Sequence, residues 1–219
     1  MSEAALREEL CLLARSLFER GLTPGSSGNI SVRLDDGTWL VTPTDASLGF
    51  LDPARLARLD AAGRLLEGDP PTKEVPLHAA FYASRSSARA VVHLHAIHSV
   101  AITLLPDLDP DDILPPLTPY ALMKAGTPAL LPYFRPGDPA AGDAIRGLAG
   151  RHAAVLLANH GPVVAGKSLK AAVFAIEELE ESARLALLMR GLNPRGLSRA
   201  QVADLVEVFA LTDVHQREE

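Results

Sequence analysis

The segment Ala90-Val91-Val92-His93-Leu94-His95 places two histidines at alternate positions at the end of an apolar run. Successive side chains of a β-strand point to opposite faces, so His93 and His95 are expected on the same face of a buried strand. Two imidazoles held side by side on a rigid strand supply half of a metal site. We therefore expect the rest of the chain to supply the other ligands, a substrate clamp and a scaffold.

A third histidine follows another apolar run. Residues 153–158 are typical of a second buried strand, and His160 lies just beyond its end. If the two strands are near neighbours, three imidazoles converge, and three neutral histidines with an open position are the pattern of catalytic zinc. Such a site would also accept manganese or cobalt. Alone, His95 or His160 would more often be an ordinary hydrogen-bonded histidine. The remaining histidines are expected to be structural or on the surface: His78, His98, His152 and His215.

Glu74 stands between a turn-rich loop and a helix expected over residues 75–82. A carboxylate at that position either favours the helix N-terminus or takes part in catalysis, and the residue alone does not decide between the two. Beside a metal ion, Glu74 would act as a proton shuttle, or bind the ion when no substrate is present.

Turn-rich segments offer groups that bind anions. Gly28 and Asn29 provide exposed backbone N–H groups and a side-chain amide, and Thr42 provides a hydroxyl group. Thr72 and Lys73 place a hydroxyl group and a cation at a helix N-terminus, which is a natural phosphate site. Each segment alone is also typical of an ordinary turn.

Strand-like and helical segments intermingle along the chain, which favours an α/β sandwich with one sheet between helical layers. The 219 residues suit one domain spanning 1–219. A hairpin is expected over 30–42, whereas 56–66 is consistent with either a short helix or a hairpin. A capping box at 198–201 predicts a last helix. We expect the tail, 216–219, to fray.

Composition narrows the range of partners and compartments. The net charge is −6, and no long basic run is present, which argues against a nucleic-acid partner. No apolar stretch reaches the roughly 18–20 residues of a membrane span, and the first residues do not resemble a signal peptide. Cys11 is the only cysteine, which excludes an intrachain disulfide and fits a cytoplasmic protein.

Five sequence blocks, in this order and spacing, resemble the class II aldolase/adducin family, which includes fuculose-phosphate aldolase and ribulose-phosphate 4-epimerase. They are Gly28-Asn29-Ile30-Ser31, Thr42-Pro43-Thr44, Lys73-Glu74 with His78 four residues on, the His93/His95 pair and Asn159-His160-Gly161. The resemblance implies a three-layer α/β/α sandwich with one central, largely antiparallel sheet, and a homotetramer with sites at subunit interfaces.

The resemblance also implies roles for single residues. His93, His95 and His160 match the zinc ligands of the family, and Glu74 matches its acid/base residue, which also binds the metal. The phosphate-loop positions correspond to Gly28, Asn29, Thr42, Thr72 and Lys73. Fuculose-type aldolases have a serine pair in place of Thr72-Lys73, which argues against their substrate. Tyr120 falls near a tyrosine that a neighbouring subunit contributes as proton donor, and a structural role for it is an equal alternative.

Segments 114–120, 132–139 and 157–166 are similar to the 3-oxo-tetronate 4-phosphate decarboxylase branch of this family. The implied reaction converts a phosphorylated sugar acid to dihydroxyacetone phosphate and CO2, with the metal stabilising the enediolate. Aldol cleavage of a sugar phosphate passes through the same enediolate, so an aldolase or 4-epimerase is the alternative. A non-catalytic adducin-like module is a further alternative, disfavoured because all three histidines and Glu74 are present.

Overall fold

The computed structural model describes residues 2–110 and 113–215, so the tail at 216–219 lies outside the described residues. None of the described helices is long and apolar enough to cross a membrane. The helices are α1 (Glu3–Glu19), α2 (Val75–Ser84), α3 (Ile97–Thr103), α4 (Pro119–Lys124), α5 (Pro139–Gly147), α6 (Leu169–Met189) and α7 (Arg199–Phe209), with short 3-10 turns at Leu48–Phe50 and Pro53–Arg55. The strands are β1 (Asn29–Arg33), β2 (Trp39–Val41), β3 (Ala57–Leu59), β4 (Leu65–Glu67), β5 (Ala90–His93), β6 (Ala129–Leu131), β7 (Ala154–Leu157) and β8 (Gly161–Gly166).

Within the described ranges, the strands form one eight-stranded sheet in the order β4-β3-β2-β1-β5-β8-β7-β6. All neighbouring pairs are antiparallel except β6 and β7, which run parallel. The histidine strand β5 is therefore central, with His93 paired to Asn29 of β1 on one side and to Val163 of β8 on the other. The predicted largely antiparallel sheet is confirmed.

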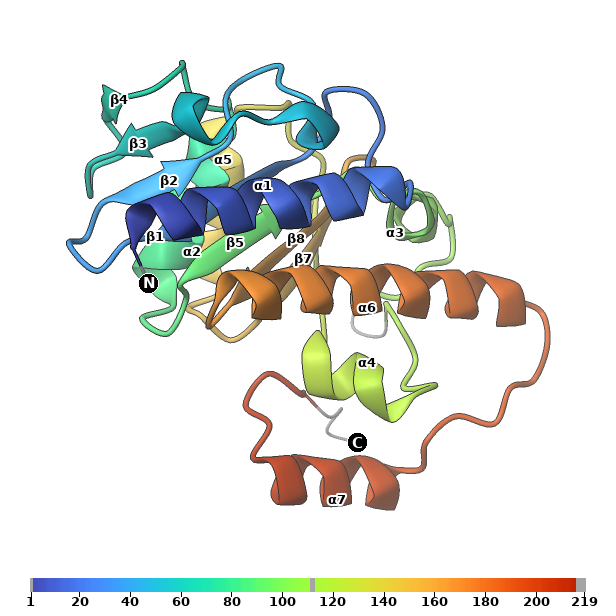
Figure 1. Cartoon of the computed structure of the whole chain (residues 1–219). Helices are drawn as coiled ribbons and strands as arrows, with labels where there is room; N and C mark the ends of the chain where they lie inside the picture. Colours follow the sequence, from blue (N-terminus) through green and yellow to red (C-terminus); the bar gives the residue numbers. More distant parts are fainter. Residues whose placement is uncertain (1, 111–112, 216–219) are drawn as a thin grey trace.

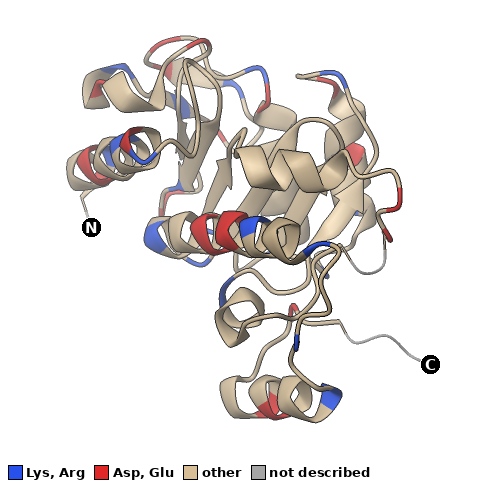
Figure 2. Ribbon diagram, turned by 90° about the vertical axis from the view of Figure 1, so that its right-hand side faces the viewer, with Lys and Arg blue, Asp and Glu red and all other residues tan. Residues whose placement is uncertain are grey.

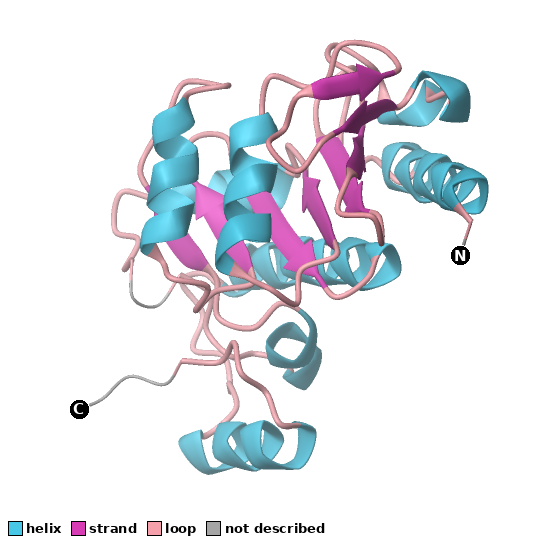
Figure 3. Ribbon diagram, turned by 90° about the vertical axis from the view of Figure 1, so that its left-hand side faces the viewer, coloured by secondary structure: helices cyan, strands magenta, loops and turns pink. Residues whose placement is uncertain are grey.

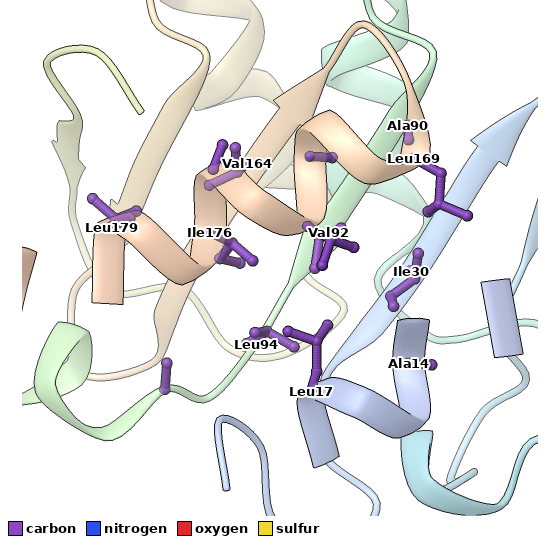
Figure 4. Packing of buried hydrophobic residues seen from close by; sticks show 14 of the residues in the cluster. Ala14, Leu17, Ile30, Ala90, Val92, Leu94, Val164, Leu169, Ile176 and Leu179 are labelled. Carbon is purple, nitrogen blue, oxygen red and sulfur yellow. The ribbon is translucent and has the colours of Figure 1, made fainter. Parts of the chain in front are cut away.

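Alternation along the central strands separates two hydrophobic clusters, one on each face of the sheet. Ile30, Val92 and Val164 pack on one face against α1 and α6, as the side chains labelled in Figure 4 show. Val91 and Val163 face the opposite side, where α2 and α5 pack. Figures 1 and 3 show the sheet lying between these two helical layers, as the predicted three-layer sandwich requires.

Charged residues lie mainly on the outer helices and loops, and the strands in the middle of the sheet carry few of them (Figure 2). Strands β5, β7 and β8 contain no Lys, Arg, Asp or Glu. Such strands are buried on both faces because helices cover both sides of the sheet. A histidine on β5 is therefore fully buried between the two helical layers.

Local hydrogen bonds explain the start of α7 and the turn of the β3–β4 hairpin. The capping box is formed, since the Ser198 and Gln201 side chains each bond to the backbone N–H of the other residue. The segment 56–66 forms the β3–β4 hairpin, which turns where Asp60 accepts hydrogen bonds from the backbone of Ala62 and Arg64. That turn resolves the choice between helix and hairpin.

Candidate metal and catalytic site

Three histidines meet at one end of the central strands. His93 is the last residue of β5 and is fully buried, His95 follows two residues later, and His160 lies in the turn between β7 and β8. Each residue offers a ligand atom, and these atoms all lie within 4.8 Å of one another. The predicted convergence of the three imidazoles is therefore observed.

The turn that carries His160 depends on two backbone features. Asn159 has a positive φ of 60°, a conformation that asparagine adopts more readily than most residues, and the backbone N–H of His160 bonds to Leu157. At Gly161, a Cβ atom would lie 2.2 Å from the carbonyl oxygen of Leu94. Because only glycine allows this approach, Gly161 keeps the His160 turn against the strand that ends in His93.

The segment that carries His95 is fixed from the other side of the sheet. Helix α3 begins two residues after His95, and its N-cap residue, Ala96, makes no side-chain capping bond. Buried Glu180 of α6 supplies the missing acceptors, because its two carboxylate oxygens accept from the backbone N–H groups of His98 and Ser99, each at 2.8 Å. The same oxygens also bond to the His98 ring and the Ser99 hydroxyl. Glu180 therefore caps α3 and was missed by the sequence analysis.

Glu74 lies at the start of α2, and its side chain is not used as a helix cap. Its carboxylate is buried and turned towards the histidines, with Oε2 3.1 Å from Nε2 of His93 and Oε1 3.6 Å from Nε2 of His160. The Asn29 amide donates to Oε2 at 3.0 Å. The structure thus favours the catalytic alternative for Glu74 over the helix cap.

The nitrogens of the triad fit a cation better than they fit one another. Nδ1 of His93 lies 2.9 Å from the carbonyl oxygen of Pro162, so it carries the hydrogen of the neutral ring. Nε2 of His93 then has only a lone pair, and it is buried without a hydrogen-bond partner among the described residues. The 3.1 Å contact between this lone pair and the Glu74 carboxylate is repulsive unless a proton or a metal cation lies between them.

The spacing of the ligand atoms agrees with a cation bound between them. Nε2 of His95 lies 3.1 Å from Nε2 of His160. Two ligands bound to zinc at about 2.0–2.1 Å with tetrahedral geometry lie about 3.3 Å apart. The donor set of three imidazoles and one carboxylate therefore fits a divalent metal ion, and we assign His93, His95 and His160 as its candidate ligands, with Glu74 beside them.

The pKa shifts of these groups favour the protonation states that bind a cation. Burial lowers the pKa of His160 to about 4, and burial also lowers the pKa values of His93 and His95. Burial by itself raises the pKa of Glu74, but His93 and the Asn29 amide outweigh it and the net shift is downward. Neutral imidazoles and an ionised carboxylate are the forms that bind metal ions.

The residues expected to bind phosphate lie around the same end of the sheet. Gly28 has a positive φ of 79°, and a Cβ there would lie 3.0 Å from the carbonyl oxygen of His93. The Thr42 hydroxyl accepts from the backbone of Ile30, and the Thr72 hydroxyl accepts from the backbone of Glu74. Lys73 is exposed, with Asp45 3.9 Å away. Binding of phosphate by these residues stays a prediction.

Tyr120 is not brought to the triad within the chain. It lies on α4, 58% exposed, and α4 packs on the side of α6 away from the sheet (Figure 1). A proton donor supplied to a neighbouring subunit would need such exposure, so this role also stays a prediction. His98 binds Glu180, and His152 packs against His215 with ring centroids 4.6 Å apart, so none of these three joins the triad.

A group of polar side chains lies behind Glu74 and was not predicted from the sequence. His78 and Tyr82 follow Glu74 at intervals of four residues along α2, and each is buried. Ser31 lies two residues after Asn29 on β1 and is also buried. The repeat of four on a helix and of two on a strand was the available signal, because each places side chains on one face.

The site described above agrees with the comparisons with known proteins. A model of the class II aldolase and adducin N-terminal domain matches residues 8–187. The 3-oxo-tetronate 4-phosphate decarboxylase of Cupriavidus necator is 50% identical over 203 residues, 93% of this chain and 93% of that protein. The protein of the same name from Escherichia coli K12 is 45% identical, over 93% of this chain and 96% of its own length. The crystal structure of YgbL from Escherichia coli has a TM-score of 0.90 at 44% identity, covering 93% of this chain and 98% of that one. The resemblance drawn from the sequence is therefore confirmed, and the chain belongs to the class II aldolase/adducin family.

Proposed function

We propose that this protein is a metal-dependent decarboxylase that converts 3-oxo-tetronate 4-phosphate to dihydroxyacetone phosphate and CO2. The observation that carries the proposal is 50% identity, over 93% of both chains, to a protein named for that substrate. The converged triad supports it, because loss of CO2 from a β-keto acid needs a group that accepts negative charge at the keto oxygen.

The metal ion, held by His93, His95 and His160, would supply Lewis-acid polarisation of the substrate's oxygen atoms. Glu74 supplies the proton. The bond between C1 and C2 breaks, CO2 leaves, and its electron pair passes into the enediolate of C2 and C3. Glu74 then delivers a proton to C2, which gives dihydroxyacetone phosphate. Because the resting carboxylate is ionised, it takes one proton from solvent in each cycle.

Finer points belong to the same proposal. Zinc is the proposed ion because three histidines with an open position suit it, and manganese or cobalt would substitute. We also propose a homotetramer in the cytoplasm, with Tyr120 reaching a neighbouring site. The exposure of Tyr120 and the single cysteine support these two points. Metal analysis of the purified protein and its mass in solution test them.

The test of the function is a direct assay. Metal-loaded protein is incubated with 3-oxo-tetronate 4-phosphate, and CO2 and dihydroxyacetone phosphate are measured together. One molecule of each product per substrate is the expected result. Absence of CO2, with cleavage of a sugar 1-phosphate to an aldehyde and dihydroxyacetone phosphate, would replace the decarboxylase with an aldolase.

A further inference from the structure

A buried line of hydrogen bonds leads away from Glu74 into the layer between the sheet and α2. Nδ2 of Asn29 donates to Oε2 of Glu74 at 3.0 Å, and Oδ1 of Asn29 lies 2.6 Å from Nε2 of His78. Nδ1 of His78 lies 2.7 Å from the Ser31 hydroxyl, which lies 2.7 Å from the Tyr82 hydroxyl. All five residues are buried. We call Asn29, His78, Ser31 and Tyr82 the buried relay.

The direction of every hydrogen in the buried relay is fixed by its two ends. At one end, an ionised carboxylate only accepts, so Asn29 presents its NH2 group to Glu74 and its oxygen to His78. His78 must then carry its hydrogen on Nε2, which leaves Nδ1 to accept from Ser31. Ser31 in turn accepts from Tyr82, so each member donates once along the line.

The far end gives the same direction independently. Among the described residues, Ser31 is the one hydrogen-bond partner of the Tyr82 hydroxyl. If the line were reversed, the buried Tyr82 hydroxyl would have no acceptor, which is unfavourable in an apolar layer. Burial raises the pKa of Tyr82 well above its usual value, so the hydroxyl group keeps the hydrogen that it donates.

The backbone spacing explains why the buried relay closes without strain. Asn29 and Ser31 are two residues apart on β1, a rise of about 6.6–6.8 Å. His78 and Tyr82 are four residues apart on α2, a rise of about 6 Å. The two repeats nearly match, so strand and helix side chains alternate along the line. Tyr82 is anchored by its edge contact with Trp39 and by Arg33 over its ring.

We propose that His78, Ser31 and Tyr82 are positioning residues, which act through Asn29 to hold the Glu74 carboxylate as a hydrogen-bond acceptor facing the histidine triad. The proposal rests on the proposed function in giving Glu74 a catalytic task. Without His78, the Asn29 amide is free to rotate and to turn its oxygen towards Glu74, where it repels the carboxylate. His78 and Ser31, in the middle of the buried relay, are fully buried, and we assign the buried relay the task of orienting Glu74 and not of carrying protons.

The first test needs no substrate and no turnover. Neutron diffraction on deuterium-exchanged protein reads the hydrogen positions directly. We expect deuterium on Nε2 and none on Nδ1 of His78, and the Tyr82 deuterium directed at Ser31. Deuterium on Nδ1, or on both nitrogens, would overturn the proposal whatever reaction the protein catalyses.

The second test compares catalysis with stability. His78→Leu removes both hydrogen bonds of the ring, and His78→Gln keeps one donor and one acceptor. Measured per folded, metal-loaded chain, we expect kcat of His78→Leu to fall about tenfold or more, as for outer-shell partners of metal sites. KM should change less than kcat, and His78→Gln should recover most of the loss.

Two further variants keep the second test decisive if His78→Leu does not fold. Tyr82→Phe removes only the hydroxyl group at the far end and should lower kcat in the same direction by a smaller factor. Ser84→Ala is the matched control on the same helix, because within the described residues its hydroxyl bonds only to the backbone of Ala80, and its kcat should not change. Full kcat in a folded His78→Leu would overturn the positioning role, and so would full kcat in Tyr82→Phe if His78→Leu does not fold. Absence of decarboxylation in the unaltered protein would instead refute the proposed function, and the neutron result would stand by itself.

Discussion

Nε2 of His93 lies 3.1 Å from Oε2 of Glu74, and the neutral His93 ring has no hydrogen to join the two atoms. The ring hydrogen of His93 is on Nδ1, held by the carbonyl oxygen of Pro162. Each atom therefore presents electron density to the other in a buried space, which a cation between them would relieve. This relationship separates the triad from an ordinary cluster of histidines.

Replacing Glu74 with glutamine should separate metal binding from proton transfer. In Glu74→Gln the three histidines remain, so we expect most of the metal to be retained and the fold to be unchanged. Loss of a proton donor typically costs about 10²–10⁴-fold in rate, and kcat should fall by that amount. Glu8→Gln, at an exposed carboxylate of α1, is the control for the change of charge. Unchanged kcat in Glu74→Gln would remove the proton-transfer role.

The metal-free protein should lose stability as pH falls below about 6.5. Burial lowers the pKa of His160 from 6.5 to about 4 in the folded chain. Between these two values the unfolded chain binds more protons, so the free energy of unfolding decreases as pH decreases. At about 1.4 kcal/mol per pKa unit, His160 contributes up to about 3 kcal/mol.

Denaturant unfolding of metal-free protein at pH 7 and at pH 4.5 measures this effect. His160→Ala should show a smaller difference between the two pH values than the unaltered protein. An equal difference in the two proteins would contradict the assignment to His160.

Glu180→Gln should weaken both the fold and the metal site. The carboxylate accepts four hydrogen bonds at the N-terminus of α3, and loss of its charge weakens bonds typically worth about 1.5–3 kcal/mol each to a charged group. We expect unfolding at lower denaturant concentration, and weaker metal binding because His95 lies two residues before α3. Glu181→Gln, at the next and more exposed position, is the matched control. Equal unfolding midpoints for the two variants would contradict the capping role.

Gly161→Ala should disturb the site through the backbone alone. The added Cβ would lie 2.2 Å from the carbonyl oxygen of Leu94, so β8 must move away from the strand that ends in His93. We expect a loss of several kcal/mol of stability, of the order seen for overpacked cores, and weaker metal binding by the His160 turn. Gly147→Ala, where no atom lies within 4 Å of the added Cβ, should be neutral or slightly stabilising. A Gly161→Ala protein as stable as Gly147→Ala would contradict the close approach.

Local patterns were sufficient for much of the fold. Apolar runs at 90–95 and at 153–158 predicted the two strands that lead to the triad, and the capping box at 198–201 predicted the last helix. Local patterns do not specify which strands are neighbours. The position of β5 between β1 and β8 results from long-range pairing, which brings Asn29 beside His93. That the whole chain forms one domain stays a prediction.

The same limit applies to side chains that meet from distant segments. Asn29 was predicted as a phosphate-binding residue, and that role stays a prediction. The contacts of its amide with Glu74 and His78 are ones that no local motif encodes. Glu180 lies 81 residues after Ser99 in the chain. The periodicity of the sequence predicts that Glu180 lies on a helix, but it does not predict the contact with Ser99. The four-residue spacing of Glu74, His78 and Tyr82 can be recognised in the sequence. The residues that these side chains contact are known only from the fold.

The most direct test of the account is metal titration of the reaction. The protein is stripped of metal, Zn²⁺ is added in steps, and dihydroxyacetone phosphate formed from 3-oxo-tetronate 4-phosphate is measured, with His160→Ala in parallel. The account predicts that activity rises in proportion to zinc up to one ion per chain and then stops, and that His160→Ala has little activity at any ratio. Full activity in the stripped protein, or normal turnover by His160→Ala, would contradict it.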